Sequence, residues 1–216
     1  MPVIQHKQAT VFIAQIDHRS NLSVGTVTGV IWALGQTAVS IAHGYRTMPC
    51  QTRVPNQSWQ MFLPIEIDGL REAMLLQATA IAVAGPELLL RLCVGNGDAE
   101  FIAAGEIRSA SGSAFVSSGR LLDAKKDRRI DHADPFLSRG AFRKADKIIA
   151  EWNTTQAKVM QVVLDPNIKD IGQAAEYLGW DVKILRNELK LAKFEQIKDM
   201  VGLGDFDRAA NWEMAT

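Results

Sequence analysis

Apolar residues in the first 130 positions follow two spacings, one typical of buried strands and one typical of amphipathic helices. Residues 9–16 (ATVFIAQI) are β-branched and aromatic and end at Asp17, as in a buried strand. In residues 22–44, apolar side chains recur every three or four positions, which predicts an amphipathic helix. The further elements predicted here are strands at 45–54 and 58–65 around a turn at 55–57, a helix at 67–85, a strand at 87–97 and a helix at 115–127.

This order of elements predicts an α+β domain in which helices pack on one face of a sheet. The pattern changes at Arg128, because polar residues and a proline follow, and the periodic segments after them are all helical. The tail carries little signal and is expected to be mobile or loosely docked. The predicted divisions are an α+β domain at 1–128, a linker and connecting helix at 129–150, a small all-α domain at 151–200 and a tail at 201–216.

Residues 171–193 (IGQAAEYLGWDVKILRNELKLAK) have the pattern of a helix-turn-helix. Ala174 and Ala175 are small enough for two helices to touch, and Gly179 suits the turn between them. Asp181 is placed to cap the second helix. The residues expected to close a small core between the helices are Leu178, Trp180, Leu185 and Leu189.

The outer face of the second helix is expected to contact DNA. Arginine and asparagine side chains suit base edges, and lysine suits phosphates. The predicted DNA-binding residues are Lys183, Arg186, Asn187 and Lys190. Packing within a helical cap is the alternative, since Asp181 and Glu188 would repel phosphate. The apolar Val182 and Ile184, with Trp180, would suit a protein partner instead.

Composition and charge limit the other classes of function. Of 216 residues, 47% are hydrophobic and 22% charged, enough to bury a core. Lys+Arg and Asp+Glu both number 24, so DNA binding requires a local patch. The chain has neither a secretory signal nor about 18 uninterrupted apolar residues, and we expect a cytoplasmic protein without membrane contact. Cys50 and Cys93 lie in apolar runs and are expected to be buried, reduced thiols.

One basic run precedes the helix-turn-helix. A solvated helix face is the ordinary explanation of such a run. Beside a helix-turn-helix, it would also extend a surface that contacts phosphates. The run consists of Arg120, Lys125, Lys126, Arg128, Arg129, Arg139, Arg143, Lys144 and Lys147.

Four stretches, in this order, resemble the SatD family, in which a divergent nucleotidyl-cyclase-like domain precedes a C-terminal helix-turn-helix. They are IDHRSN, SWQMFLP, LLLRLCVGNGDAEF with GSAFVSSGRLLDAKK, and WNTTQAKVMQVVL. The resemblance spans roughly residues 10–195. It implies a ferredoxin-like, nucleotidyl-cyclase-like sheet followed by a small all-α helix-turn-helix domain. By analogy with cyclase-type domains, it also implies a homodimer.

The resemblance implies a metal site that this sequence keeps only in part. Catalytic cyclase folds hold two metal ions between a carboxylate that ends the first strand and another at the hairpin tip. Asp17 takes the first position, but Pro55, Asn56 and Gln57 at the tip are uncharged. One carboxylate and two amides bind a hard divalent ion weakly. We therefore expect no cofactor and favour a non-enzymatic role, in which Asp17 caps the turn or helix that follows it.

Three functions fit these observations. The first is a DNA-binding regulatory protein, in which a cyclase-like domain with a degenerate metal site serves for dimerisation or ligand sensing. A nucleotide is a candidate ligand. The second is an enzyme acting on a nucleoside triphosphate, in which Asp17 binds Mg²⁺ and Asp98 or Glu100 replaces the missing carboxylate. The third is a module for protein–protein assembly.

Overall fold

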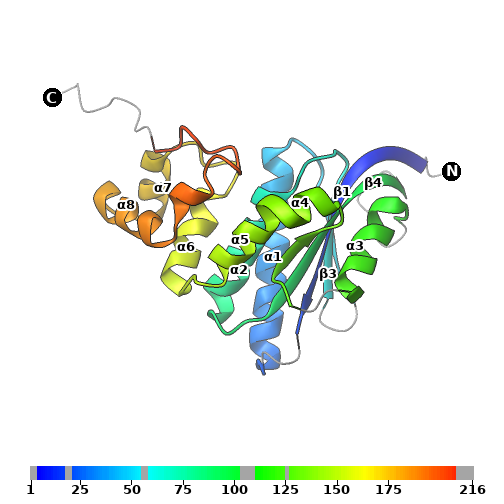
Figure 1. Cartoon of the computed structure of the whole chain (residues 1–216), viewed down its shortest axis with the longest axis horizontal. Coiled ribbons are helices and arrows are strands. Elements are labelled where there is room, and N and C mark those ends of the chain that lie inside the picture. Colours follow the sequence, from blue (N-terminus) through cyan, green and yellow to red (C-terminus); the bar gives the residue numbers. More distant parts are fainter. Residues whose placement is uncertain (1–3, 18–20, 55–57, 103–109, 125–126, 208–216) are drawn as a thin grey trace.

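The computed structural model describes residues 4–17, 21–54, 58–102, 110–124 and 127–207 (Figure 1). Its centre is a five-stranded sheet of order β2-β3-β1-β4-β5. The strands are β1 (Ile4–Ile16), β2 (Cys50–Val54), β3 (Ser58–Leu63), β4 (Leu90–Ile102) and β5 (Ile130–His132). Neighbouring strands are antiparallel except for the parallel pair β4 and β5. The first four strands have the ferredoxin-like order, so the predicted α+β class is confirmed.

Helices cover both faces of the sheet (Figure 1). The three helices of this region are α1 (Val24–Gly44), α2 (Leu70–Ala84) and α3 (Ser113–Ala124). Phe12 of β1 packs with α1 and α2, whereas its neighbour Val11 points to the opposite face and packs with α3. Cys50 and Cys93 are buried on the α3 side, as expected. Helices α1 and α2 lie on one face of the sheet, as expected, but α3 lies on the opposite face. The expectation of helices on one face only is therefore wrong for α3, because β1 is apolar on both faces.

Helix α1 is the one helix in the described ranges that is long and apolar enough to cross a membrane. Val30, Leu34 and Ile41 on its apolar side are fully buried, and the helix packs against α2 and the sheet. Ser23 begins the helix by accepting a hydrogen bond from the backbone N–H of Thr26. These contacts make α1 a helix of the protein's own core.

The sheet continues past residue 128, the boundary expected from the sequence, because β5 begins at Ile130. The elements after β5 are α4 (Pro135–Leu137), η3 (Ser138–Phe142) and α5 (Arg143–Ile149). The Asp146 carboxylate accepts hydrogen bonds from the backbone N–H groups of Arg129 at 2.7 Å and Ile130 at 3.1 Å. These two hydrogen bonds hold α5 against β5. Burial raises the pKa of the Asp146 carboxyl group. The segment expected to be a linker is therefore part of the packed sheet domain.

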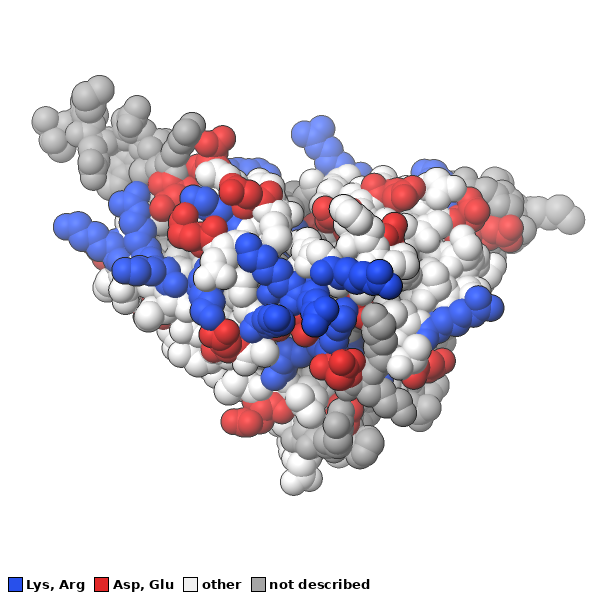
Figure 2. Space-filling view, viewed as in Figure 1, with Lys and Arg blue, Asp and Glu red and all other residues white. Residues whose placement is uncertain are grey.

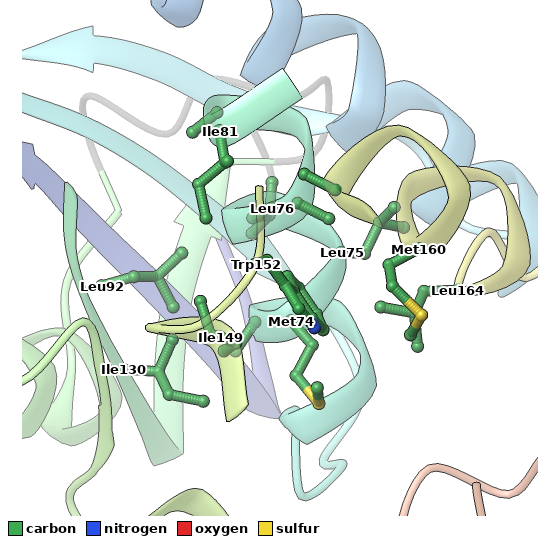
Figure 3. Close-up of a cluster of buried hydrophobic side chains, with 14 of the residues drawn as sticks. Met74, Leu75, Leu76, Ile81, Leu92, Ile130, Ile149, Trp152, Met160 and Leu164 are labelled. Atoms are coloured by element: carbon green, nitrogen blue, oxygen red, sulfur yellow. The ribbon is translucent and has the colours of Figure 1, made fainter. Parts of the chain in front are cut away.

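The C-terminal helices share one hydrophobic core with the sheet domain. They are α6 (Thr154–Val163), α7 (Ile171–Leu178), α8 (Val182–Leu191) and η4 (Phe194–Gln196). Trp152 is 2% exposed, and Figure 3 shows it in the same cluster as Met74 and Leu76 of α2 and Met160 of α6. Its indole Nε1 donates a hydrogen bond to the carbonyl oxygen of Ala192, at 3.0 Å. Trp152 therefore joins α2 and α6 to the end of α8.

The first part of the C-terminal tail is docked. Phe206 is 2% exposed and packs on Phe194, with ring centroids 5.9 Å apart. The carbonyl oxygen of Phe206 accepts a hydrogen bond from the N–H of Ile171, at 3.1 Å. The expectation of a mobile or loosely docked tail is therefore wrong up to Asp207, because the buried Phe206 ring packs between α7 and η4. Residues 208–216 lie outside the described ranges.

Glu72 is a buried carboxyl group within α2. It is 2% exposed and accepts a hydrogen bond from the Tyr45 hydroxyl, at 2.7 Å. Burial raises the pKa of Glu72, and burial together with the nearby Glu72 carboxylate raises the pKa of Tyr45. A carboxyl group whose pKa is higher in the folded than in the unfolded state stabilises the fold less as the pH rises above the unfolded value.

We therefore expect wild type to lose stability relative to Glu72→Gln as the pH rises from about 5 to about 8, above the unfolded glutamate pKa of about 4.3. Glutamine keeps an oxygen to accept the Tyr45 hydrogen bond but has no charge to bury. Urea unfolding at several pH values measures the difference. Glu176→Gln, on the exposed side of α7, controls for the loss of one negative charge. Parallel profiles for wild type and Glu72→Gln would contradict the prediction.

Candidate functional site

Helices α7 and α8 are joined by a turn of three residues. Gly179 begins the turn with φ 66°, a left-handed conformation that glycine adopts without steric cost. The Asp170 carboxylate accepts a hydrogen bond from the N–H of Gln173 at 2.9 Å and caps α7. Asp181 accepts one from the N–H of Lys183 at 2.7 Å and caps α8. The structure therefore has two helices, a glycine turn and an Asp181 cap at the positions expected from the sequence.

One side of α8 is anchored in the core, and the other faces solvent. Leu185 and Leu189 are 0% and 4% exposed. Val182 and Trp180 are half-buried and pack on the same core. Of the three apolar residues that suit a protein partner, only Ile184 projects outwards, with 56% of its surface exposed.

The four predicted DNA-contacting residues all lie on the solvent side of α8. Lys183, Arg186, Asn187 and Lys190 are exposed, and Figure 2 shows basic side chains gathered over this helix. Arg186 has a partner within the chain, because its Nε lies 3.3 Å from Oδ1 of Asp207. The two side chains are 48% and 41% exposed, and exposed pairs contribute about 0–1 kcal/mol. Sequence reasoning missed this contact, which places an acidic residue beside the basic face.

The basic run before α6 divides into an exposed group and a structural group. The exposed residues are Arg139, Arg143, Lys144 and Lys147, and Figure 2 shows basic side chains gathered over α5 on the same view as those of α8. Arg128 contacts the Asp131 carboxylate at 3.2 Å, and Arg129 donates to the carbonyl oxygen of Leu88. These two arginines therefore hold β5 in place. Arg120 is exposed on α3, and residues 125–126 lie outside the described ranges.

Asp17 follows the last residue of β1 and is 8% exposed. Its backbone N–H donates to the carbonyl oxygen of Leu89 at 2.8 Å, and its Oδ2 lies 4.0 Å from Nε of Arg91. A nearby guanidinium competes with any cation for this carboxylate. Across the described ranges, no group of three or more His, Cys, Asp or Glu residues is placed to hold a metal. The hairpin tip at 55–57 lies outside these ranges.

Asp98 and Glu100 lie towards the other end of the sheet from Asp17. Asp98 pairs with Gln8 across β1 and β4, and its carboxylate accepts a hydrogen bond from Gln8 Nε2 at 2.7 Å. Nine positions along β1 separate Gln8 from Asp17, or about 30 Å at about 3.3 Å per residue. The hypothesis that Asp98 or Glu100 completes a metal site with Asp17 is therefore wrong within one chain.

The architecture is that of an α+β protein with a ferredoxin-like sheet and a C-terminal helical region that exposes one basic helix face. No protein-family model and no curated protein matches the chain. Solved structures of similar fold include the guanylyl cyclase domain of the RhoGC fusion protein from the aquatic fungus Blastocladiella emersonii. It has 14% identity and a TM-score of 0.40, and the match covers 58% of this chain and 79% of that chain.

A second similar structure is the adenylyl cyclase CyaB from P. aeruginosa. It has 15% identity and a TM-score of 0.36, and the match covers 57% of this chain and 75% of that chain. Likeness at this level concerns the fold alone.

Proposed function

We propose that the chain is a DNA-binding regulatory protein in which α7 and α8 form a helix-turn-helix and α8 contacts duplex DNA. The observation that carries the proposal is the division of α8 into two sides. Leu185 and Leu189 anchor it, while Lys183, Asn187 and Lys190 project into solvent. A helix held in this way is suited to enter a major groove, with lysines on phosphates and an amide on base edges. The resemblance to the SatD family supports the same function.

The exposed basic residues of α5 add support. A protein with no net charge binds DNA only through local concentrations of positive charge, and this chain has two of them on the face shown in Figure 2. Arg143 and Lys147 lie on exposed positions of α5. Each additional lysine or arginine near the phosphates releases counterions and steepens the salt dependence of binding.

In this proposal the sheet domain is a scaffold for dimerisation or ligand sensing. The ion pair between Asp17 and Arg91 favours a structural role for this carboxylate over metal chemistry, so the proposal requires no cofactor. A homodimer would present two copies of α8, and dimeric helix-turn-helix proteins read half-sites about one helical turn apart. A cytoplasmic location fits contact with DNA.

The proposal is tested by reversing two charges on α8. We expect Lys183→Glu/Lys190→Glu to weaken binding to a random-sequence duplex at least about tenfold at low salt, and to reduce the salt slope by about two. Fluorescence anisotropy between about 50 and about 200 mM salt measures both quantities. Neither side chain is buried, so the fold is retained.

Arg120→Glu is the matched control, since Figure 1 places α3 at the far end of the molecule from α8. It changes an exposed positive charge to a negative one without altering α8. The proposal fails if wild type shows no salt-dependent binding, or if the α8 double variant and Arg120→Glu bind equally well.

A further inference from the structure

A polar cleft of about 780 Å³ lies away from both α8 and Asp17. It is formed by the loop between β3 and α2, the middle of β4, one side of α3 and the turn after β5. Its volume is within the range of small-molecule sites. Its lining residues include Glu66, Asp68, Asn96, His132 and Asp134.

The loop on one side of the cleft is held in place by buried hydrogen bonds. Thr10 of β1 is fully buried, and its hydroxyl accepts a hydrogen bond from the N–H of Ile67 at 2.9 Å. The same hydroxyl lies within donating distance of the carbonyl oxygen of Ile65, at 3.1 Å. Asn96 of β4 donates through Nδ2 to the carbonyl oxygen of Ile67, at 2.8 Å. The wall is therefore formed before any ligand arrives.

The charged side chains that line the cleft are all acidic: Glu66, Asp68 and Asp134. Asp68 Oδ1 accepts from the N–H of Leu70 at 3.0 Å, and Asp134 Oδ1 accepts from the N–H of Phe136 at 2.7 Å. These bonds fix two carboxylates and leave further lone pairs on each. Because no lysine or arginine of the described part of the chain lines the cleft, its potential favours a positively charged ligand.

Two buried polar atoms of the lining residues have no hydrogen-bond partner among the described residues. His132 is 2% exposed, and its Nδ1 accepts from the N–H of Asp134 at 2.9 Å. The ring proton of the neutral imidazole is therefore on Nε2, which has no acceptor. Burial lowers the pKa of His132, in keeping with a neutral ring. Asn96 uses Nδ2 on the loop, and its Oδ1 has no donor.

An unpaired buried donor and an unpaired buried acceptor each cost free energy that a ligand would recover. We propose that this cleft binds a small organic cation that carries a hydrogen-bond acceptor near its charged nitrogen. The positive charge of the ligand lies in the negative potential of the three carboxylates, its N–H group donates to Asn96 Oδ1, and its acceptor takes a hydrogen bond from the His132 Nε2–H group.

A divalent metal ion fits the same residues poorly. His132 Nδ1 is occupied by the Asp134 N–H, and Nε2 carries the ring proton, so neither nitrogen offers a lone pair. In the described ranges, no three or more metal-ligating side chains come together. The site is therefore suited to an organic cation, which it recognises by the ligand's positive charge and by the ligand's hydrogen-bond acceptor.

Calorimetric titration of the full chain with L-argininamide tests the proposal. Argininamide has a guanidinium, an ammonium and a carbonyl acceptor, whereas agmatine has both cationic groups and no carbonyl. We expect argininamide to bind at least about tenfold more tightly than agmatine, a difference of about 1.4 kcal/mol. We also expect Glu66→Gln/Asp68→Asn to weaken argininamide binding at least about tenfold, because two of three carboxylates lose their charge. Both positions are exposed, and the amide oxygen that Asp68→Asn introduces can still accept from the Leu70 N–H.

Glu176→Gln on α7 is the control and should bind argininamide as wild type does. In ¹⁵N-edited spectra, argininamide should shift the His132 Nε2 resonance, and agmatine should leave it unchanged. The proposal is overturned if argininamide does not bind, if the double variant binds it as tightly as Glu176→Gln, or if Mg²⁺ alone displaces it. DNA titrations play no part in this test, so its outcome is independent of the function proposed for α8.

Discussion

Replacing Trp152 with alanine is expected to lower the free energy of unfolding by about 3–5 kcal/mol, as for other fully buried aromatic residues. Trp152 is 2% exposed and lies in the cluster formed with α2 and α6 (Figure 3). Its removal leaves a cavity where the sheet domain meets the C-terminal helices. It also leaves the carbonyl oxygen of Ala192 without its donor. Urea unfolding followed by circular dichroism measures the change.

Trp152→Phe separates packing from hydrogen bonding. Phenylalanine keeps an aromatic ring in the core but cannot donate to the Ala192 carbonyl, and an unsatisfied buried acceptor costs about 1–3 kcal/mol. We therefore expect a loss of stability smaller than that of Trp152→Ala. A loss below about 1 kcal/mol for Trp152→Ala would mean that the helices do not share the core described above.

Replacing Gly95 with alanine is expected to cost about 1–3 kcal/mol, as overpacking of a core does. Gly95 lies in β4, in close contact with α3. A Cβ at this position would lie 2.5 Å from the Ser117 Oγ, and 2.8 Å from the Ala114 carbonyl oxygen and the Ser118 N. Two of these atoms are backbone atoms of α3, so the helix itself has to shift. Thermal and urea unfolding measure the cost.

Gly119→Ala provides the control, on the helix α3 that packs against Gly95. A Cβ at Gly119 would meet only the Ile13 Cδ1, at 3.9 Å. Alanine is favoured over glycine within a helix by about 0.5–1 kcal/mol, so this variant should be more stable than wild type. Equal effects of the two substitutions would contradict the close approach of α3 to β4.

The hydrophobic pattern was enough to predict most elements of the fold. A long periodic segment such as α1 buries one face, and this requirement is visible as a regular spacing of apolar residues in the sequence. The turn at Gly179 and the cap at Asp181 were also predictable, because both depend on residues next to each other in the chain. The exposed positions of α8 follow from the same helical spacing.

Features that depend on long-range packing were not predictable in this way. Strand β5 has three residues and relies on β4 and α5 for its place. Helix α3 covers the second face of the sheet because β1 is apolar on both sides. The continuous apolar run at residues 11–14 indicates a strand buried on both faces, but it does not say which helix covers the second face. Phe206 docks on α7 and η4 through contacts that no local pattern signals.

The same limit applies to the candidate sites. The basic residues of α8 are neighbours on one helix, but the pairing of Arg186 with Asp207 joins positions that only the docked tail brings together. Asp17 was a candidate metal ligand only in the enzyme hypothesis, and its proximity to Arg91 arises from the β1–β4 register. His132 and Asn96 become notable only when their missing hydrogen-bond partners are known.

The core shared by the sheet and the C-terminal helices has a consequence for dynamics. Phe12 of β1 and Leu189 of α8 belong to the same cluster of buried side chains. Elements that share a core tend to open together, and a ligand that binds only the folded state makes such opening rarer. DNA held by α8 would therefore slow hydrogen exchange at the amides of β1, which the DNA does not touch.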